Sequence, residues 1–346
     1  MRFKHVREAI QCFDDVIKKQ PQSIEALVNK GKALHFLQRD DEAIVVLDQA
    51  ISIKPDSVVA YCNKGRALEA TSQPHLAVEA YNKALETDPF DLEAVIGLGY
   101  CLFSMCQYDE AVDTFEKGLN LSPNDTDLMF MKAAALVNLE DFENAVTTYK
   151  QLLEKDETNA SAWLQLGVSI QATKNDGGDV VDDEAKRCFD KVFDLKPKSV
   201  EVLTEIGQAL ITGNQVGQAV VYYKEAVELD PSRVESYQNL ADALLMVAQY
   251  KEAISYYSKA LEIEPTKIDL LHNQGQAYSL LGDYEEALKC YKKVLVDHPK
   301  DASSLFLMSR ALDVLGREEE SQQALEDAKA IDPELVDDMQ NVDGNE

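Results

Sequence analysis

The sequence predicts an all-α fold, an α-solenoid in which paired helices stack so that each pair packs only against its neighbours. Two observations predict it. Hydrophobic residues make up 45% of the chain and aromatic residues only 8%, which suits helices packed through Ala, Leu and Val. Nine of the ten prolines also share a spacing of 34 residues, and a fixed period of this size indicates stacked supersecondary units. These prolines form two series: Pro21, Pro55, Pro89, Pro123 and Pro197, Pro231, Pro265, Pro299, Pro333.

The two series join through Glu157 if six extra residues are allowed near Asn175. With each proline at position 32 of its repeat, the chain is one solenoid over residues 1–335, followed by an acidic tail, 336–346. The repeats are a half repeat, 1–23, then 24–57, 58–91, 92–125, 126–159, 160–199 with a loop insertion, 200–233, 234–267, 268–301 and 302–335.

Two positions of the repeat are small and two are large. Position 8 holds Gly, Ala or Ser, and position 20 holds Ala in every repeat but the last, so we expect the two helices of a repeat to approach closely at these positions. Position 24 is bulky or aromatic, as in Phe115 and Tyr257, and position 11 is Leu, Ile or Tyr. The alternation of small and large groups predicts that successive layers interlock.

The ends of the helices are also predicted. Position 34 provides side-chain oxygens that can accept from free N–H groups of the next helix, at Ser23, Ser57, Asp91, Asp125, Asn159, Ser199 and Asp301. The proline two residues earlier stops the preceding helix because it has no N–H to donate.

Small residues at 8 and 20, an aromatic at 24 and proline at 32 resemble the tetratricopeptide repeat (TPR) family, and the resemblance covers residues 1–335. It implies antiparallel helix pairs in a right-handed superhelix, with the first helix of each pair lining a concave groove.

The sequence departs from the family pattern in two places. The first repeat lacks its leading helix, so Val6, Ile10, Phe13 and Ile17 are short of a partner, and this face either follows further protein or docks on another molecule such as a second copy. Residues Thr173–Val180 lengthen a turn, which we interpret as a plain loop instead of a calcium site.

In the family, positions 2, 5, 6, 9, 12 and 13 of the first helix face the groove. The resemblance therefore assigns three stretches of candidate partner-binding residues. A polar and basic stretch contains Asn29, Lys32, His35, Cys62, Asn63 and Arg66. An apolar stretch contains Ile96, Tyr100, Phe103, Phe130, Met131, Leu164 and Val168. A second polar stretch contains Gln238, Asn239, Asp242, His272, Asn273 and Gln276.

Asparagine recurs at position 6, and its amide can both donate to and accept from the backbone of an extended peptide. This is similar to the asparagine ladder in the TPR superhelix of O-GlcNAc transferase and in kinesin light chains. The alternative is that these asparagines are ordinary solvated helix residues. The apolar residues have an alternative too, since Ile96 and Leu164 can bury into a neighbouring helix. The lysine and asparagine set with which chaperone-binding TPR domains clamp a carboxylate is not present in any three successive repeats.

The composition narrows the classes of partner and chemistry. The formal charge is 34 − 62 = −28, which makes nucleic acid and anionic membranes poor partners and favours a basic or partly hydrophobic protein or peptide. No catalytic or phosphate-binding motif is present, and the five histidines do not cluster, so we expect neither catalysis nor a cofactor nor a metal site. The six cysteines lack framework spacing, which favours reduced thiols in an intracellular, most simply cytoplasmic, protein.

The leading interpretation is a non-catalytic adaptor that binds an extended or helical segment of a partner protein in its groove. A second is the recruiting region of a larger enzyme such as a glycosyltransferase. A third is a structural subunit that self-assembles, for example as a homodimer through the N-terminal half repeat.

Overall fold

The computed structural model describes residues 2–174 and 181–337, and side chains from His5 onward. Most of the predicted loop insertion, residues 175–180, and most of the acidic tail, 338–346, lie outside these ranges. Nineteen helices and no strand occupy the described residues, which confirms the predicted all-α solenoid. The helices are α1 Arg2–Lys19, α2 Ile24–Phe36, α3 Asp40–Ile53, α4 Val58–Ala70, α5 Pro74–Thr87, α6 Leu92–Ser104, α7 Tyr108–Leu121, α8 Thr126–Asn138, α9 Phe142–Lys155, α10 Ala160–Lys174, α11 Asp183–Leu195, α12 Val200–Thr212, α13 Val216–Leu229, α14 Val234–Met246, α15 Tyr250–Ile263, α16 Ile268–Leu281, α17 Tyr284–Asp297, α18 Ala302–Val314 and α19 Glu318–Ile331.

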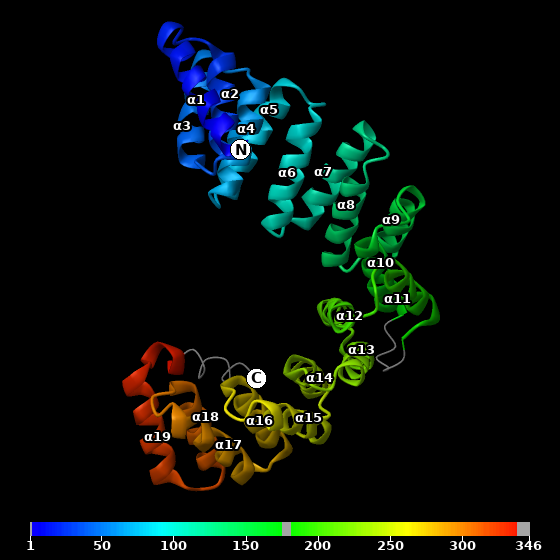
Figure 1. Cartoon of the computed structure of the whole chain (residues 1–346), viewed down its shortest axis with the longest axis vertical. Coiled ribbons are helices and arrows are strands. Elements are labelled where there is room, and N and C mark those ends of the chain that lie inside the picture. The colour runs from blue at the N-terminus through cyan, green and yellow to red at the C-terminus, as the bar shows by residue number, and fades with distance from the viewer. Residues whose placement is uncertain (1, 175–180, 338–346) are drawn as a thin grey trace. The chain divides into compact units, whose positions relative to one another are not determined.

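The chain divides into two compact bodies, an N-terminal body of residues 1–173 and a C-terminal body of residues 174–346. Within the N-terminal body each helix from α1 to α9 packs on the next, and within the C-terminal body the same holds from α12 to α19 (Figure 1). The first helices of successive repeats also touch, as α2 does α4 and α4 does α6 in one body, and α12 does α14 and α14 does α16 in the other. First helices therefore form a row from α2 to α6 in one body and from α12 to α16 in the other.

The boundaries of the helices follow the local signals closely. Every helix that precedes one of the nine periodic prolines ends two residues before it, as α3 ends at Ile53 before Pro55. The predicted N-cap side chains accept from the following helix in all cases but Ser57; the Asp91 carboxylate, for example, accepts from the N–H of Ala94 at 2.8 Å. These contacts satisfy donors that a helix end would otherwise leave unpaired.

The core of each repeat is built on the small and large positions, with one difference from the expectation. Position 20 alanines such as Ala111 are 0% exposed, and so is Phe115 at position 24. A Cβ atom at Gly99, position 8, would lie 2.5 Å from Cε1 of Phe115, far inside van der Waals contact. Glycine at position 8 thus makes room for the large ring at position 24, whereas we expected it to oppose the small residue at position 20.

The turn between the two helices of a repeat has the same backbone conformation in eight of the repeats. Position 15 is left-handed, with φ of 57–59° at Gln38, Ser72, Cys106, Glu140, Asn214 and Ala248, 90° at Gly282 and 71° at Gly316. Side chains with a Cβ pay a steric cost in this region. The sharp reversal that brings the helices of a pair together is therefore maintained even where glycine is absent.

Candidate partner-binding face

The apolar candidates on α6 and α8 combine exposure with rigid placement. Tyr100 is 40% exposed, and Ile96, Phe103, Phe130 and Met131 are half-buried. The three aromatic rings make edge-to-face contacts with rings of the second helices: Tyr100 with Phe115, Phe103 with Tyr108, and Phe130 with Tyr149, at centroid separations of 5.9, 5.4 and 5.6 Å. Such contacts fix the orientation of a ring while one part of it remains accessible.

Leu164 is buried, although its repeat position predicts that it lies on the open face. It is only 5% exposed, and Val168 on the same helix is 2% exposed. The reason is the composition of α10, in which Leu164, Leu166, Val168 and Ile170 occupy alternating positions and therefore point in several directions around the helix. From Leu164 to Ala172 every residue but Gln165 is buried, so each side of this helix is covered. Leu164 and Val168 contribute to packing and do not belong to an accessible binding face.

Asn63, in the N-terminal polar stretch, is a second correction. Its side chain is nearly inaccessible, and its Nδ2 donates to the carbonyl of Val59, one turn earlier in α4, at 2.6 Å. An amide that is buried and bonded to its own helix cannot hold the backbone of a peptide. Arg66, by contrast, is exposed and forms an ion pair at 3.0 Å with Glu93 at the start of α6. Lys32 is exposed and Asn29 is half-buried on α2.

The C-terminal body contains a polar network that joins successive first helices. Oδ1 of Asp242 on α14 accepts from the Tyr257 hydroxyl at 2.5 Å and from Nδ2 of Asn273 on α16 at 3.0 Å. Burial raises the pKa of the Asp242 carboxyl, and these two donors oppose that rise. The network holds the side chains of α14 and α16 in one arrangement.

A second link in this body runs from α16 to α18. Nε2 of His272 lies 2.6 Å from the Ser304 hydroxyl and 3.2 Å from Oδ2 of Asp301. His272 and Asn273 therefore use part of their hydrogen-bonding capacity within the protein. Of the four asparagines at position 6, Asn29 and Asn239 are half-buried and make no side-chain hydrogen bond within the described residues. The NH2 donor and the carbonyl acceptor of these two side chains therefore both remain available to a ligand.

In the N-terminal half repeat, the residues that lack a packing partner are not all the ones that we expected. Ile10 is buried and Ile17 packs into the same core cluster, which includes Leu27 and Leu34 of α2. These isoleucines face the next repeat and are covered by it. The uncovered part is instead a groove of about 470 Å³ between α1 and α2. It is lined by His5, Val6, Ala9, Phe13, Asn29, Lys32, Ala33 and Phe36.

The described residues contain neither a metal-binding cluster nor a helix suited to cross a membrane. No group of three or more His, Cys, Asp or Glu side chains in this part of the chain is arranged to hold a metal ion. No described helix combines the length and the apolar character that crossing a bilayer requires.

Comparison with known proteins identifies tetratricopeptide repeats in this chain. Models of the tetratricopeptide repeat match residues 24–57, 130–175, 200–233, 237–295 and 272–335, and a model of anaphase-promoting complex (cyclosome) subunit 3 matches residues 72–152. No curated protein matches the sequence.

Solved structures are similar to this chain at low identity. The C-terminal part of a TPR repeat-containing protein from Cytophaga hutchinsonii matches with a TM-score of 0.55 and 18% identity, over 69% of this chain and 96% of that one. YrrB, a TPR protein with an unusual peptide-binding site, matches with a TM-score of 0.49 and 21% identity, over 55% of this chain and 95% of that one. The match to the Cytophaga hutchinsonii protein supports the fold, and the matches to the repeat models identify the periodic residues as tetratricopeptide repeats. The chain belongs to the tetratricopeptide repeat superfamily.

Proposed function

We propose that this chain is a non-catalytic scaffold that binds an extended or helical segment of a partner protein on the face of its first helices. Membership of the tetratricopeptide repeat superfamily supports a protein-interaction scaffold. The observation that carries the finer proposal is the group Tyr100, Phe103 and Phe130 on α6 and α8. These rings are fixed by edge contacts and remain partly accessible. Rigid aromatic side chains are the usual anchors of protein interfaces because little rotamer entropy is lost on binding.

The partner that fits this face has apolar side chains for α6 and α8 and carries basic or neutral residues elsewhere. A net charge of −28 disfavours an acidic partner through long-range repulsion. On the C-terminal body, Asn239, Asp242, His272 and Asn273 would contact polar groups of a partner segment. We place this interaction inside the cell, because none of the six cysteines, all of which lie in the described residues, forms a disulfide.

Affinity capture followed by mass spectrometry tests the proposal. The double variant Phe103→Ser, Phe130→Ser should lose the partner that the wild-type chain captures, with the helical circular dichroism unchanged. Phe90→Ser is the matched control, since it removes a ring that is 73% exposed and lies outside the first helices. Tyr100→Ser repeats the test while disturbing less packing. Capture of the same partner in the same amount by the double variant and by Tyr100→Ser would exclude this face as the binding surface.

Self-association is a second candidate function, and the groove between α1 and α2 favours it. Val6, Ala9 and Phe13 line that groove together with Ala33 and Phe36 of α2, so it offers apolar surface to a second copy. Sedimentation velocity of the whole chain and of a variant lacking residues 1–20 distinguishes the candidates. A dimer that becomes a monomer on truncation supports self-association, whereas a monomer in both samples excludes it.

A further inference from the structure

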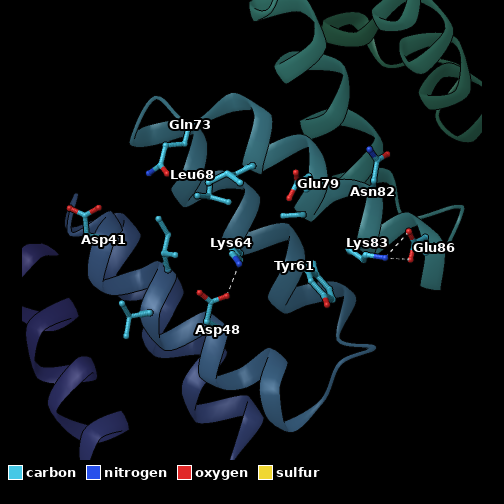
Figure 2. Close-up of a pocket in the computed structure, with 14 residues that line it drawn as sticks. Asp41, Asp48, Tyr61, Lys64, Leu68, Gln73, Glu79, Asn82, Lys83 and Glu86 are labelled. Carbon is cyan, nitrogen blue, oxygen red and sulfur yellow. Dashed lines mark hydrogen bonds and ion pairs between the residues drawn. The ribbon is translucent and has the colours of Figure 1, made fainter.

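A cavity of about 750 Å³ opens between the second helices α3 and α5, and residues of α4 form its floor (Figure 2). The floor side chains Tyr61, Lys64 and Leu68 are spaced by three and four residues and therefore share one side of α4. Arg66, on the proposed binding face, follows Lys64 by two residues, a rotation of about 200° at 3.6 residues per turn. The cavity thus lies on the opposite side of α4 from the face described above.

The floor and the rim of this cavity carry apolar side chains. Leu68 and Ala80 are buried at its base, and Ile44 is half-buried beside them. At the rim, Val45 on α3 is 59% exposed and Leu76 on α5 is 46% exposed. Branched aliphatic side chains that remain exposed around a hollow of this size are typical of a site that a partner covers.

The charges around the opening are acidic in sum. Four carboxylates and two lysines line the cavity, which gives 2 − 4 = −2. Both lysines are already paired, Lys64 with Asp48 at 2.6 Å and Lys83 with Glu86 at 2.7 Å. The two remaining carboxylates are therefore the ones whose charge a partner would meet.

Those remaining carboxylates belong to Asp41 on α3 and Glu79 on α5. Within the described residues, neither carboxylate forms an ion pair or a side-chain hydrogen bond. Figure 2 shows them on two sides of the opening, with Leu68 and Lys64 between them. A partner with cationic groups on both sides of an apolar one would match this arrangement.

We propose that the cavity between α3 and α5 is a docking site for a basic amphipathic segment of a partner protein. One bulky apolar side chain of that segment enters the cavity between Ile44 and Leu68. Flanking lysine or arginine side chains contact Asp41 and Glu79. The site is independent of the proposed function, because it lies on the side of α4 opposite to the proposed binding face. The scaffold could therefore hold two segments at once.

A labelled synthetic peptide provides the test. The probe is an amphipathic helix of leucine and lysine, about 15 residues long so that it can form a helix, and its binding to the whole chain is followed by fluorescence anisotropy. The charge-reversed variant Asp41→Lys, Glu79→Lys should bind the peptide at least about tenfold more weakly, which corresponds to about 1.4 kcal/mol. Leu76→Ser tests the apolar contribution without a change of charge and should also weaken binding.

The matched control is Asp109→Lys, Asp113→Lys. These exposed residues of α7 stand at the same repeat positions as Asp41 and Glu79, so the control changes the net charge equally and alters a helix in the same way. We expect it to retain the affinity of the wild type within about twofold, which is less than 0.5 kcal/mol. Circular dichroism of each variant establishes that the helices are intact.

Several outcomes would overturn the inference. Equal weakening in the cavity variant and the control would mean that net charge alone attracts the peptide. Unchanged affinity in both the charge-reversed variant and Leu76→Ser would mean that the peptide binds elsewhere. The variant Phe103→Ser, Phe130→Ser should keep the binding that the charge-reversed cavity variant loses. If it loses the probe while the cavity variant keeps it, the peptide occupies the face of the first helices. That last result would leave the proposed function standing and remove this one.

Discussion

Tyr257 and Tyr149 allow one chemical change to be tested in two environments. Both occupy repeat position 24 and both are 0% exposed. The hydroxyl of Tyr257 donates to the Asp242 carboxylate at 2.5 Å, whereas the hydroxyl of Tyr149 is buried without a hydrogen-bond partner in the described part of the chain. Replacement by phenylalanine removes the same oxygen from each. We expect Tyr257→Phe to destabilise the protein and Tyr149→Phe to stabilise it.

The sizes follow from the two hydroxyls. A hydrogen bond to a charged group contributes about 1.5–3 kcal/mol, and Asp242 would keep only its contact with Asn273, so Tyr257→Phe should cost an amount in that range. Burial of an unpaired hydroxyl costs about 1–3 kcal/mol, so its removal in Tyr149→Phe should recover about 1 kcal/mol or more. The two variants should therefore differ by at least about 2.5 kcal/mol, with opposite signs.

Native-state hydrogen exchange is the suitable assay, because the two tyrosines lie in different compact bodies. Peptide-resolved exchange follows the amides of α9 and of α15 separately. A change of 1.4 kcal/mol alters an exchange rate about tenfold when exchange occurs from an equilibrium opening. The amides of α15 should exchange at least about tenfold faster in Tyr257→Phe, and those of α9 several times more slowly in Tyr149→Phe.

The background variant Asp242→Asn is the control for the mechanism. With the charge removed, Tyr257→Phe should cost much less than in the wild type, and the coupling between the two residues should fall between about 0.5 and 3 kcal/mol. Loss of stability in Tyr149→Phe comparable to that in Tyr257→Phe would refute the reasoning. So would a cost for Tyr257→Phe that is the same with and without the Asp242 carboxylate.

Two further predictions concern the turns and the helix junctions. Gly282→Ala should destabilise the protein by about 1 kcal/mol through backbone strain alone, because φ is 90° and no atom lies within 4 Å of the added Cβ. Ala248→Gly, at φ 58°, should leave the stability unchanged or raise it slightly. Thermal denaturation compares the two variants, and an equal loss of stability in both would contradict the strain argument. The Arg233 hydrogen bond lowers the pKa of Glu201 from 4.5 to about 2, so the contribution of this bond to stability is present above pH 4.5 and is lost as the pH falls towards 2. In Arg233→Gln the pKa of Glu201, measured by NMR titration, should return towards 4.5. An unchanged pKa would exclude the arginine as the cause of the shift.

The sequence by itself determined the features that depend on one or two turns of helix. Prolines without an N–H stop helices two residues earlier, and oxygens such as that of Asp91 pair with the first N–H groups of the next helix, so boundaries followed directly from residue type. The 34-residue period then fixed which residues are equivalent, and with them the small and large core positions. These signals are local, and a repeat protein states each of them many times.

Only the tertiary structure decided which side chains of the predicted face are accessible. Leu164 lies on a helix that is buried on every side, and Asn63 bonds to its own helix, although both occupy positions that the repeat assigns to the groove. The cavity between α3 and α5 depends likewise on how far apart two second helices stand and on which lysines pair with which acids. Exposure, and pairing such as that of Lys64 with Asp48, depend on neighbours in other helices, and no pattern within a single helix records them.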